Sequence, residues 1–137
     1  MPDQVYDNFR ELLATGQFNW VADDVDAYLI DMNQYTFDIQ HQFLSSVPVG
    51  ARVAVATLTG KTATRGACMA DTPTTFSLVN GPTIQAVLLV KNVSNDPSMS
   101  PLIVLIMSYS NLSNVTPNGG NIYVHWPSGD SNKIFRV

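Results

Sequence analysis

Two short runs of uninterrupted apolar residues constrain the fold of this chain more than any other feature. Residues 86–90 read AVLLV and residues 102–107 read LIVLIM, so neither run has a polar side chain at any position. Both are far shorter than the ~20 residues that a membrane-spanning helix needs, and both have the usual length of a β-strand. A strand that is apolar on both faces has to be covered on both faces. We therefore predict that these two strands lie at the centre of a layered β structure or meet a partner subunit.

Shorter strand-like stretches, separated by turn signals, fill most of the remaining chain. The sequences NGP (80–82), PNGG (117–120) and PSGD (127–130) are turn signals, and the spacing between such signals is about 8 to 12 residues, as in β-sandwiches and barrels. This predicts a mainly β fold, a β-sandwich or jelly-roll-like arrangement, in a single domain over residues 1–137. Residues 61–70 are expected to pair with the strand before them or to follow it in extended form. The predicted strands are residues 25–32, 50–60, 74–78, 83–91, 101–109, 121–126 and 133–137.

The N-terminal stretch has apolar residues at helical spacing. Asp3 is a suitable N-cap and Gly16 a suitable stop, which predicts a short N-terminal helix over residues 3–14. One further short helix, of one or two turns, is predicted over residues 38–47 and is closed by Pro48. The apolar stripe of the first helix has to cover a surface, which is either its own sheet or that of a neighbouring molecule; both alternatives stay open. The stripe consists of Val5, Tyr6, Phe9, Leu12 and Leu13.

The charge pattern argues against two classes of partner. Charged residues make up 13% of the chain, about half of the usual ~25%, and the formal net charge is -4. The seven Lys and Arg residues are scattered along the sequence, whereas contacts with phosphates need clustered cations. The N-terminus lacks the cationic start and the apolar core of a signal peptide. We therefore expect a protein with no nucleic-acid partner and no membrane partner.

No metal or cofactor site is predicted. Asp23, Asp24 and Asp26, with Asp31 beyond them, form the strongest acidic cluster, but the glycine and the glutamate of a calcium loop are missing. We interpret the cluster as the solvated start of a strand. The only two histidines, His41 and His125, fall in different predicted elements, and no Cys/His spacing supplies the ligands of a zinc site.

Catalytic motifs are also missing from the sequence. There is no nucleophile elbow, no P-loop and no dinucleotide fingerprint. Cys68 is the only cysteine, and between Ala67 and Met69 it is expected to be a small buried hydrophobe. We predict that the protein is not an enzyme; turnover that depends on His41 or His125 would revive that alternative. What remains is a rigid binding or structural domain.

Beyond these patterns, the sequence shows a family resemblance along almost the whole chain. The order FNW…VDAYLIDMNQYT…HQFLSSVPVGARVA…TLTGKT…FSLVNG…QAVLLVK…SPLIVLI…VTPNGGNIYVHW…GDSNKIFRV resembles a family of small virion proteins of tailed bacteriophages. The resemblance is densest at residues 50–53, 58–61, 116–120 and 133–135. These segments are predicted turns and strand ends, so they point to a fold and carry no chemistry.

The resemblance implies a capsid decoration, or cement, protein. Such a protein binds the outside of the assembled shell, at joints between capsomers of the major capsid protein, and stabilises it. It would be a homo-oligomer, a dimer or trimer, located on the outer surface of the virion and in the host cytoplasm during assembly. The apolar strands of this chain imply a larger subunit interface. The candidate shell or subunit contacts are Tyr6, Phe9, Leu12, Leu13, Tyr123 and Trp126.

A second implied role is a tail, neck or fibre protein that binds a receptor or glycan. In that role the important side chains would be aromatic groups on the surface, because aromatic rings stack on sugars. The candidates for this role are Tyr109, Tyr123 and Trp126.

Overall fold

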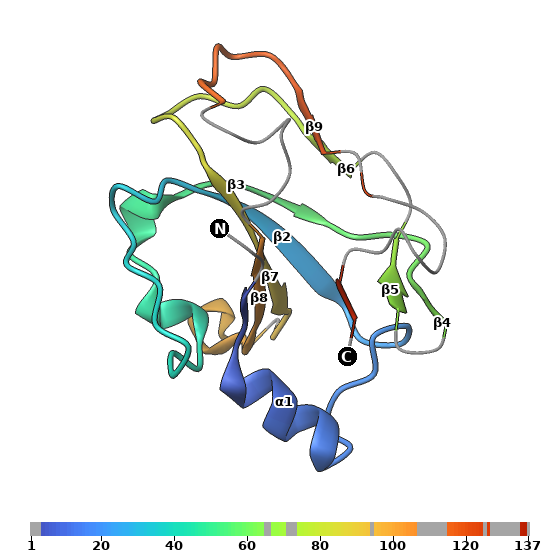
Figure 1. Cartoon of the computed structure of the whole chain (residues 1–137). Coiled ribbons are helices and arrows are strands. Elements are labelled where there is room, and N and C mark those ends of the chain that lie inside the picture. Colours follow the sequence, from blue (N-terminus) through green and yellow to red (C-terminus); the bar gives the residue numbers. More distant parts are fainter. Residues whose placement is uncertain are drawn as a thin grey trace.

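The computed structural model describes residues 4–64, 67–70, 74–93, 95–106, 115–124, 126 and 135–136, and it confirms a mainly β fold (Figure 1). The jelly-roll form of the fold stays a prediction. Short 3-10 turns are labelled η. The elements are β1 (Gln4–Val5), α1 (Asp7–Ala14), β2 (Val25–Ile30), η1 (Leu44–Ser46), η2 (Val49–Ala51), β3 (Arg52–Thr57), β4 (Thr62–Thr64), β5 (Ala67–Met69), β6 (Thr74–Phe76), β7 (Ala86–Lys91), η3 (Pro97–Met99), β8 (Leu102–Ile106), β9 (Ile122–Val124) and β10 (Phe135–Arg136).

A five-stranded antiparallel sheet forms the centre of the molecule, in the order β1-β8-β7-β2-β3. The two apolar runs are β7 and β8, which pair with each other. Every residue of β8, and every residue of β7 except Lys91, is buried. The prediction that these strands lie at the centre and are covered on both faces is confirmed.

The first face of this sheet is covered by α1 and by residues from the smaller sheets. Phe9 of α1 packs edge-on against Phe18, with ring centroids 5.0 Å apart. Because the sheet side chains on this face alternate along each strand with those of the opposite face, β2 contributes Val25, Ala27 and Leu29 here. The remaining buried members of this first cluster are Trp20, Leu58, Cys68, Phe76, Val79, Ile84, Val87, Leu89, Ile103, Val104, Ile106, Val124 and Trp126.

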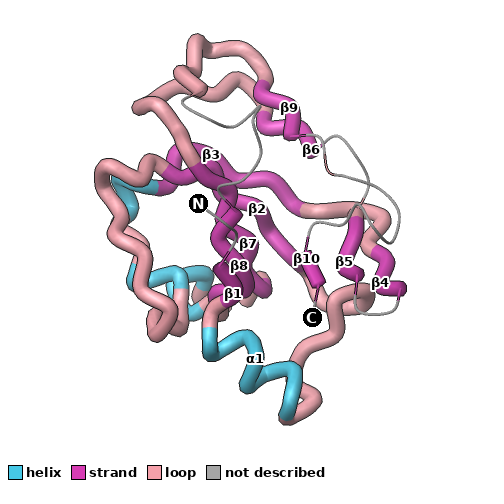
Figure 2. Tube along the Cα trace, viewed as in Figure 1, coloured by secondary structure: helices cyan, strands magenta, loops and turns pink. Residues whose placement is uncertain are grey.

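The second face is covered by the segment between β2 and β3. Figure 2 shows that this segment, residues 31–51, is mostly loop with short helical turns. Its side chains Tyr35, Leu44 and Val47 pack on the sheet, together with Tyr6. The sheet residues of this second cluster are Ile30, Ala86, Leu88, Val90, Leu102 and Leu105. The expectation that the apolar strands form a larger subunit interface is therefore wrong, because the chain itself covers them.

Arg52, at the start of β3, is hydrogen-bonded to the segment that covers the second face. Its guanidinium donates to the carbonyl of Leu44 at 2.8 Å and twice to the carbonyl of Val47, at 2.7 and 3.1 Å. The Leu44 carbonyl also accepts the Val47 amide within the turn, at 2.9 Å, and the Val47 carbonyl directly follows η1. A side chain of the sheet thus holds the loop that covers the sheet.

Two smaller sheets lie beside the central one. β4 pairs with β5, and β5 pairs with β10, so residues 61–70 pair with each other and with the chain end rather than with β3. β6 pairs with β9, and this two-stranded ribbon lies next to β3 (Figure 1). No helix in the described ranges is long and apolar enough to cross a membrane.

The predicted helices differ from the observed ones at their ends. The first helix begins at Asp7 rather than at residue 3, because Gln4 and Val5 pair with Leu105 and Val104 of β8. A backbone that pairs with a sheet edge cannot also make helical hydrogen bonds. Asp3, the predicted N-cap, lies outside the described residues. Of the predicted helix over residues 38–47, only η1 forms.

Candidate functional site

Three of the six predicted contact residues are part of the protein's own core. Tyr6 and Phe9 are fully buried, and Trp126 is 4% exposed. The Trp126 indole N–H donates to the Thr74 hydroxyl at 2.6 Å, which accounts for its polar group inside the molecule. The prediction that these three side chains contact a shell or a sister subunit is wrong for the folded chain, since they are covered by their own domain.

The two leucines of the helix have an intermediate position. Leu12 and Leu13 are half-buried and pack against the first cluster. Of the two alternatives for the apolar stripe of α1, the structure therefore supports the one in which the stripe covers its own sheet. The sequence could not decide this, because a helix of eight residues shows the same spacing whatever it covers.

Tyr123 is the one predicted contact residue that is well exposed, at 49%. It lies on β9 directly opposite Thr75 of β6, and both side chains point away from the core. Leu78, which follows β6, is 74% exposed. We call the surface formed by Thr75, Ser77, Leu78, Asn121 and Tyr123 the β6–β9 face; it contains no charged residue.

Leu78 is held in an unusual backbone conformation. Its φ is +50°, a left-handed conformation that is uncommon for residues other than glycine and costs of the order of 1 kcal/mol. The Asn121 side chain accepts the Leu78 amide at 3.0 Å and donates to the Tyr123 hydroxyl at 3.4 Å. Asn121 therefore links the backbone of Leu78 to the Tyr123 hydroxyl.

The turn at residues 117–120 is hydrogen-bonded to Val79, next to this face. The Gly119 amide donates to the Val79 carbonyl at 2.8 Å, and the Val79 amide donates to the Gly120 carbonyl at 2.9 Å. Gly119 has a φ of +86°, so the turn requires a residue without a side chain there. These bonds attach the turn to the segment that carries Leu78.

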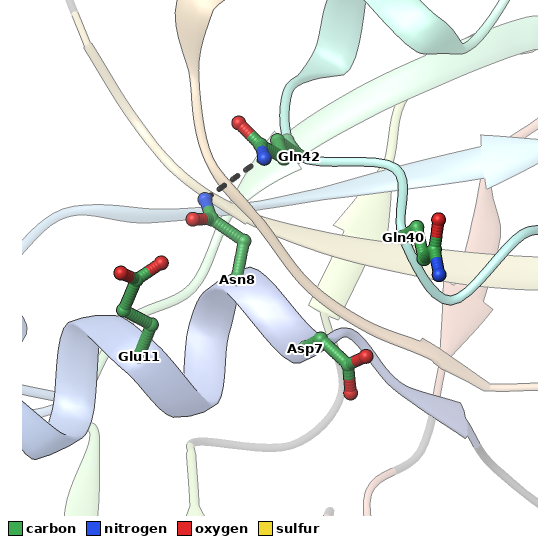
Figure 3. A pocket seen from close by; sticks show the side chains of 5 residues that line it. All are labelled: Asp7, Asn8, Glu11, Gln40 and Gln42. Carbon is green, nitrogen blue, oxygen red and sulfur yellow. Dashed lines mark hydrogen bonds between the residues drawn. The ribbon is translucent and has the colours of Figure 1, made fainter.

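A polar hollow of about 270 Å³ lies between α1 and residues 40–42 (Figure 3). Figure 3 shows Asn8 reaching the backbone carbonyl of Gln42, at 3.4 Å. Asp7 is paired with Arg10 at 3.2 Å, on the surface of the helix. The side-chain groups that line the hollow are carboxylates and amides, so it can exchange hydrogen bonds with a ligand. Its lining residues are Asp7, Asn8, Glu11, Gln40 and Gln42.

A chain of three hydrogen-bonded side chains lies beneath the loop beside this hollow. The Tyr6 and Tyr35 hydroxyls are 2.8 Å apart, and the Tyr35 hydroxyl is 2.9 Å from Nδ1 of His41. Burial of Tyr6, together with its hydrogen bond to Tyr35, raises the pKa of the Tyr6 hydroxyl well above its ordinary value. Burial also raises the pKa of Tyr35. Sequence patterns gave no indication of this cluster, because Tyr6 lies 29 residues before Tyr35 in the chain.

The acidic cluster is less solvated than predicted. Asp26 is 6% and Asp31 is 3% exposed, so the interpretation as a solvated strand start is wrong for both. Asp26 accepts hydrogen bonds from Thr57 at 2.8 Å and Asn92 at 2.6 Å, which compensates the burial of its charge. Within the described ranges, no group of three or more His, Cys, Asp or Glu residues is arranged to hold a metal ion.

Cys68 is buried, as predicted. Burial raises the pKa of its thiol to about 11. The thiolate is the reactive form of cysteine, so this residue is a packing group. His125 and Tyr109, which the sequence singled out, lie outside the described residues.

Alkaline pH is expected to destabilise the protein from about pH 9 upward. In the unfolded chain the Cys68 thiol loses its proton near its ordinary pKa, whereas in the folded protein it stays protonated up to about pH 11. The unfolded state then binds fewer protons, so the contribution of Cys68 to the free energy of unfolding falls by about 2 kcal/mol between pH 9 and 11, and the buried Tyr6 hydroxyl, whose pKa is also raised, adds to the fall. Urea denaturation at both pH values measures this. Cys68→Ala is expected to lose less stability over that interval, and an identical loss in both proteins would contradict the assignment.

Comparison with known proteins gave no match, either to a protein-family model or to a curated protein sequence.

Proposed function

We propose that this chain is a structural virion protein of a tailed bacteriophage, which binds the outside of the assembled capsid at joints between capsomers of the major capsid protein and stabilises the shell. The observation that carries the proposal is the β6–β9 face, an uncharged surface with two exposed apolar side chains, Leu78 and Tyr123. One of the segments that resemble the virion family most closely, residues 116–120, builds the turn that supports this face. Exposed aromatic and apolar anchors are the usual centres of protein interfaces.

The proposed mechanism needs neither catalysis nor a cofactor. A protein that binds the assembled lattice, and not its dissociated subunits, shifts the equilibrium towards the lattice by mass action. We propose that it does so as a homo-oligomer, a dimer or trimer, because closed symmetry is the common form of such assemblies. Linked copies can each bind weakly and still bind tightly together. The proposed location is the outer surface of the virion, with the host cytoplasm as the site of assembly.

The number of copies per purified virion, relative to the major capsid protein, tests this function directly. Quantitative peptide mass spectrometry should give a ratio near one-to-one or a simple lattice fraction of it. A handful of copies would instead indicate a tail or neck component. Complete absence from virions would refute a virion role.

Replacing both Leu78 and Tyr123 with serine is expected to weaken shell binding at least tenfold. The two side chains supply the apolar area of the β6–β9 face, and a tenfold loss corresponds to about 1.4 kcal/mol. Co-sedimentation of the variant with shells that lack the protein measures binding. The matched control is Val21→Ser with Val49→Ser, which removes two other exposed apolar side chains. Equal binding by both double variants would rule out this face.

A glycan- or receptor-binding role on a tail, neck or fibre is the second candidate. Of the three aromatic residues suggested for it, Trp126 is buried and Tyr109 lies outside the described residues. Exposed Tyr123 is the observation that still favours it. Binding of the isolated domain to a glycan array, lost on Tyr123→Ala, would support this role; a silent array together with location on the head would exclude it.

A further inference from the structure

Two Asn-Gly pairs of this chain lie close to the β6–β9 face. They are Asn80-Gly81 and Asn118-Gly119, and both asparagines are exposed. An asparagine followed by glycine can react with its own backbone, because glycine has no side chain that hinders the approach of its amide nitrogen to the asparagine side chain. Sequence and exposure treat the two pairs alike, so any difference between them has to come from their hydrogen bonds.

In the second pair, hydrogen bonds hold both of the groups that would react. The Gly119 amide donates to the Val79 carbonyl at 2.8 Å. The side-chain oxygen of Asn118 accepts the Gly120 amide at 3.0 Å, which is the local bond that asparagine commonly forms in turns. Both bonds have to break before the Gly119 nitrogen can reach the Asn118 side chain. The folded structure therefore protects Asn118.

The first pair is not held in this way. Among the described residues, no hydrogen bond involves the Asn80 side chain or the Gly81 amide. Exposed side chains change rotamer within picoseconds to nanoseconds, so Asn80 is free to turn its side chain towards the following nitrogen. Gly81 has a φ of +137°, which glycine adopts without strain. The described fold therefore holds neither reacting group of Asn80-Gly81 away from the other.

We propose that Asn80 is a site of spontaneous deamidation, whereas Asn118 is protected by the fold. The Gly81 nitrogen attacks Cγ of Asn80, and a C–N bond forms. The bond between Cγ and Nδ2 breaks, and the side-chain nitrogen leaves as ammonia with the proton of the Gly81 amide. Water then opens the resulting succinimide ring at either carbonyl. The product is aspartate or isoaspartate, each with one new negative charge.

The new carboxylate lies beside a surface that has no charge of its own. Asn80 follows Leu78 by two residues, and its side-chain oxygen lies 3.3 Å from the position that a Cβ would take on Gly119. The β6–β9 face contains no charged residue, and an ionised group at its edge opposes burial against a partner, because it has to lose its water. Deamidation is therefore expected to weaken shell binding. This consequence rests on the proposed function, whereas the deamidation itself does not.

Peptide mass spectrometry of the folded wild-type protein, aged at mildly alkaline pH, measures the reaction at both sites. Conversion of Asn80 is expected to be at least about tenfold faster than conversion of Asn118, because the reaction of Asn118 has to break two hydrogen bonds. In urea these bonds are absent, and the two rates should lie within about threefold of each other. Equal rates in the folded protein, a faster Asn118, or no conversion of Asn80 overturns the proposal.

Two variants test the effect of the charge on shell binding. Asn80→Asp carries the charge of the product, and Asn80→Ser is its uncharged control. In co-sedimentation with shells that lack the protein, Asn80→Asp is expected to bind at least about threefold more weakly than Asn80→Ser. Equal binding by these two, with binding lost in the double variant of Leu78 and Tyr123, would refute the charge effect alone. If the double variant also keeps its binding, the β6–β9 face is not the shell contact, and the ageing rates still decide whether Asn80 deamidates.

Discussion

Replacing Phe9 with serine is expected to lower the free energy of unfolding by about 3 to 5 kcal/mol. Phe9 is fully buried in the first cluster and packs edge-on against Phe18. Truncating a buried aromatic side chain removes its transfer free energy and leaves a cavity, and serine adds a hydroxyl that needs a partner. Because α1 has eight residues, it cannot persist without this packing.

Chemical denaturation followed by tryptophan fluorescence measures the effect, since Trp20 belongs to the same cluster. Leu78→Ser is the matched control: it also replaces a large apolar residue with serine, but at a position that is 74% exposed. It is expected to change the free energy of unfolding by less than about 0.5 kcal/mol. If Phe9→Ser left the stability unchanged, the helix stripe would be free to contact a partner, which is the alternative that its burial argues against.

Replacing Arg52 with alanine is expected to cost about 2 to 4 kcal/mol. The guanidinium supplies three hydrogen bonds to the carbonyls of Leu44 and Val47, and hydrogen bonds from a charged donor contribute about 1.5 to 3 kcal/mol each at most. Their loss leaves two carbonyls of buried residues without this donor.

The planar fork of arginine matters here as well as its charge. Arg52→Lys should retain part of the stability, because an ammonium can reach one of the two carbonyls but cannot hold both in the same geometry. Hydrogen exchange resolved by peptide locates the effect: faster exchange is expected over residues 44–51 in Arg52→Ala, and an intermediate rate in Arg52→Lys. Uniformly faster exchange across the whole sheet, with no local excess, would show that the guanidinium does not act on this loop.

The sequence predicted the elements that depend on local pattern. The apolar runs at residues 86–90 and 102–107 are too short to span a membrane, so a covered β-strand is the conformation that their pattern predicts. The central strands β7 and β8 lie at these positions. Residues 121–126 were likewise predicted to form a strand, and β9 (Ile122–Val124) lies within them.

The remaining features depend on partners far away in the sequence. Asp26 is buried because Thr57 and Asn92 meet its carboxylate, and these lie 31 and 66 residues away. The first turn of the predicted helix is instead strand β1, because its backbone pairs with the edge of β8. No sequence pattern predicts the left-handed backbone conformation of Leu78, since the side chain that accepts its amide is Asn121, 43 residues further on. The candidate face was therefore only partly predictable: Tyr123 was identified, and Leu78 was not.

The position of β1 has a consequence for how the molecule comes into being. Gln4 pairs with Leu105, so during synthesis β1 has to wait for a partner about 100 residues later in the chain. Closing so long a loop is entropically expensive, and proteins dominated by such distant pairings fold slowly. Until β8 has been made, the apolar stripe of α1 has no sheet to cover. We therefore expect a chain interrupted before residue 102 to expose the side chains that form the core of the finished protein.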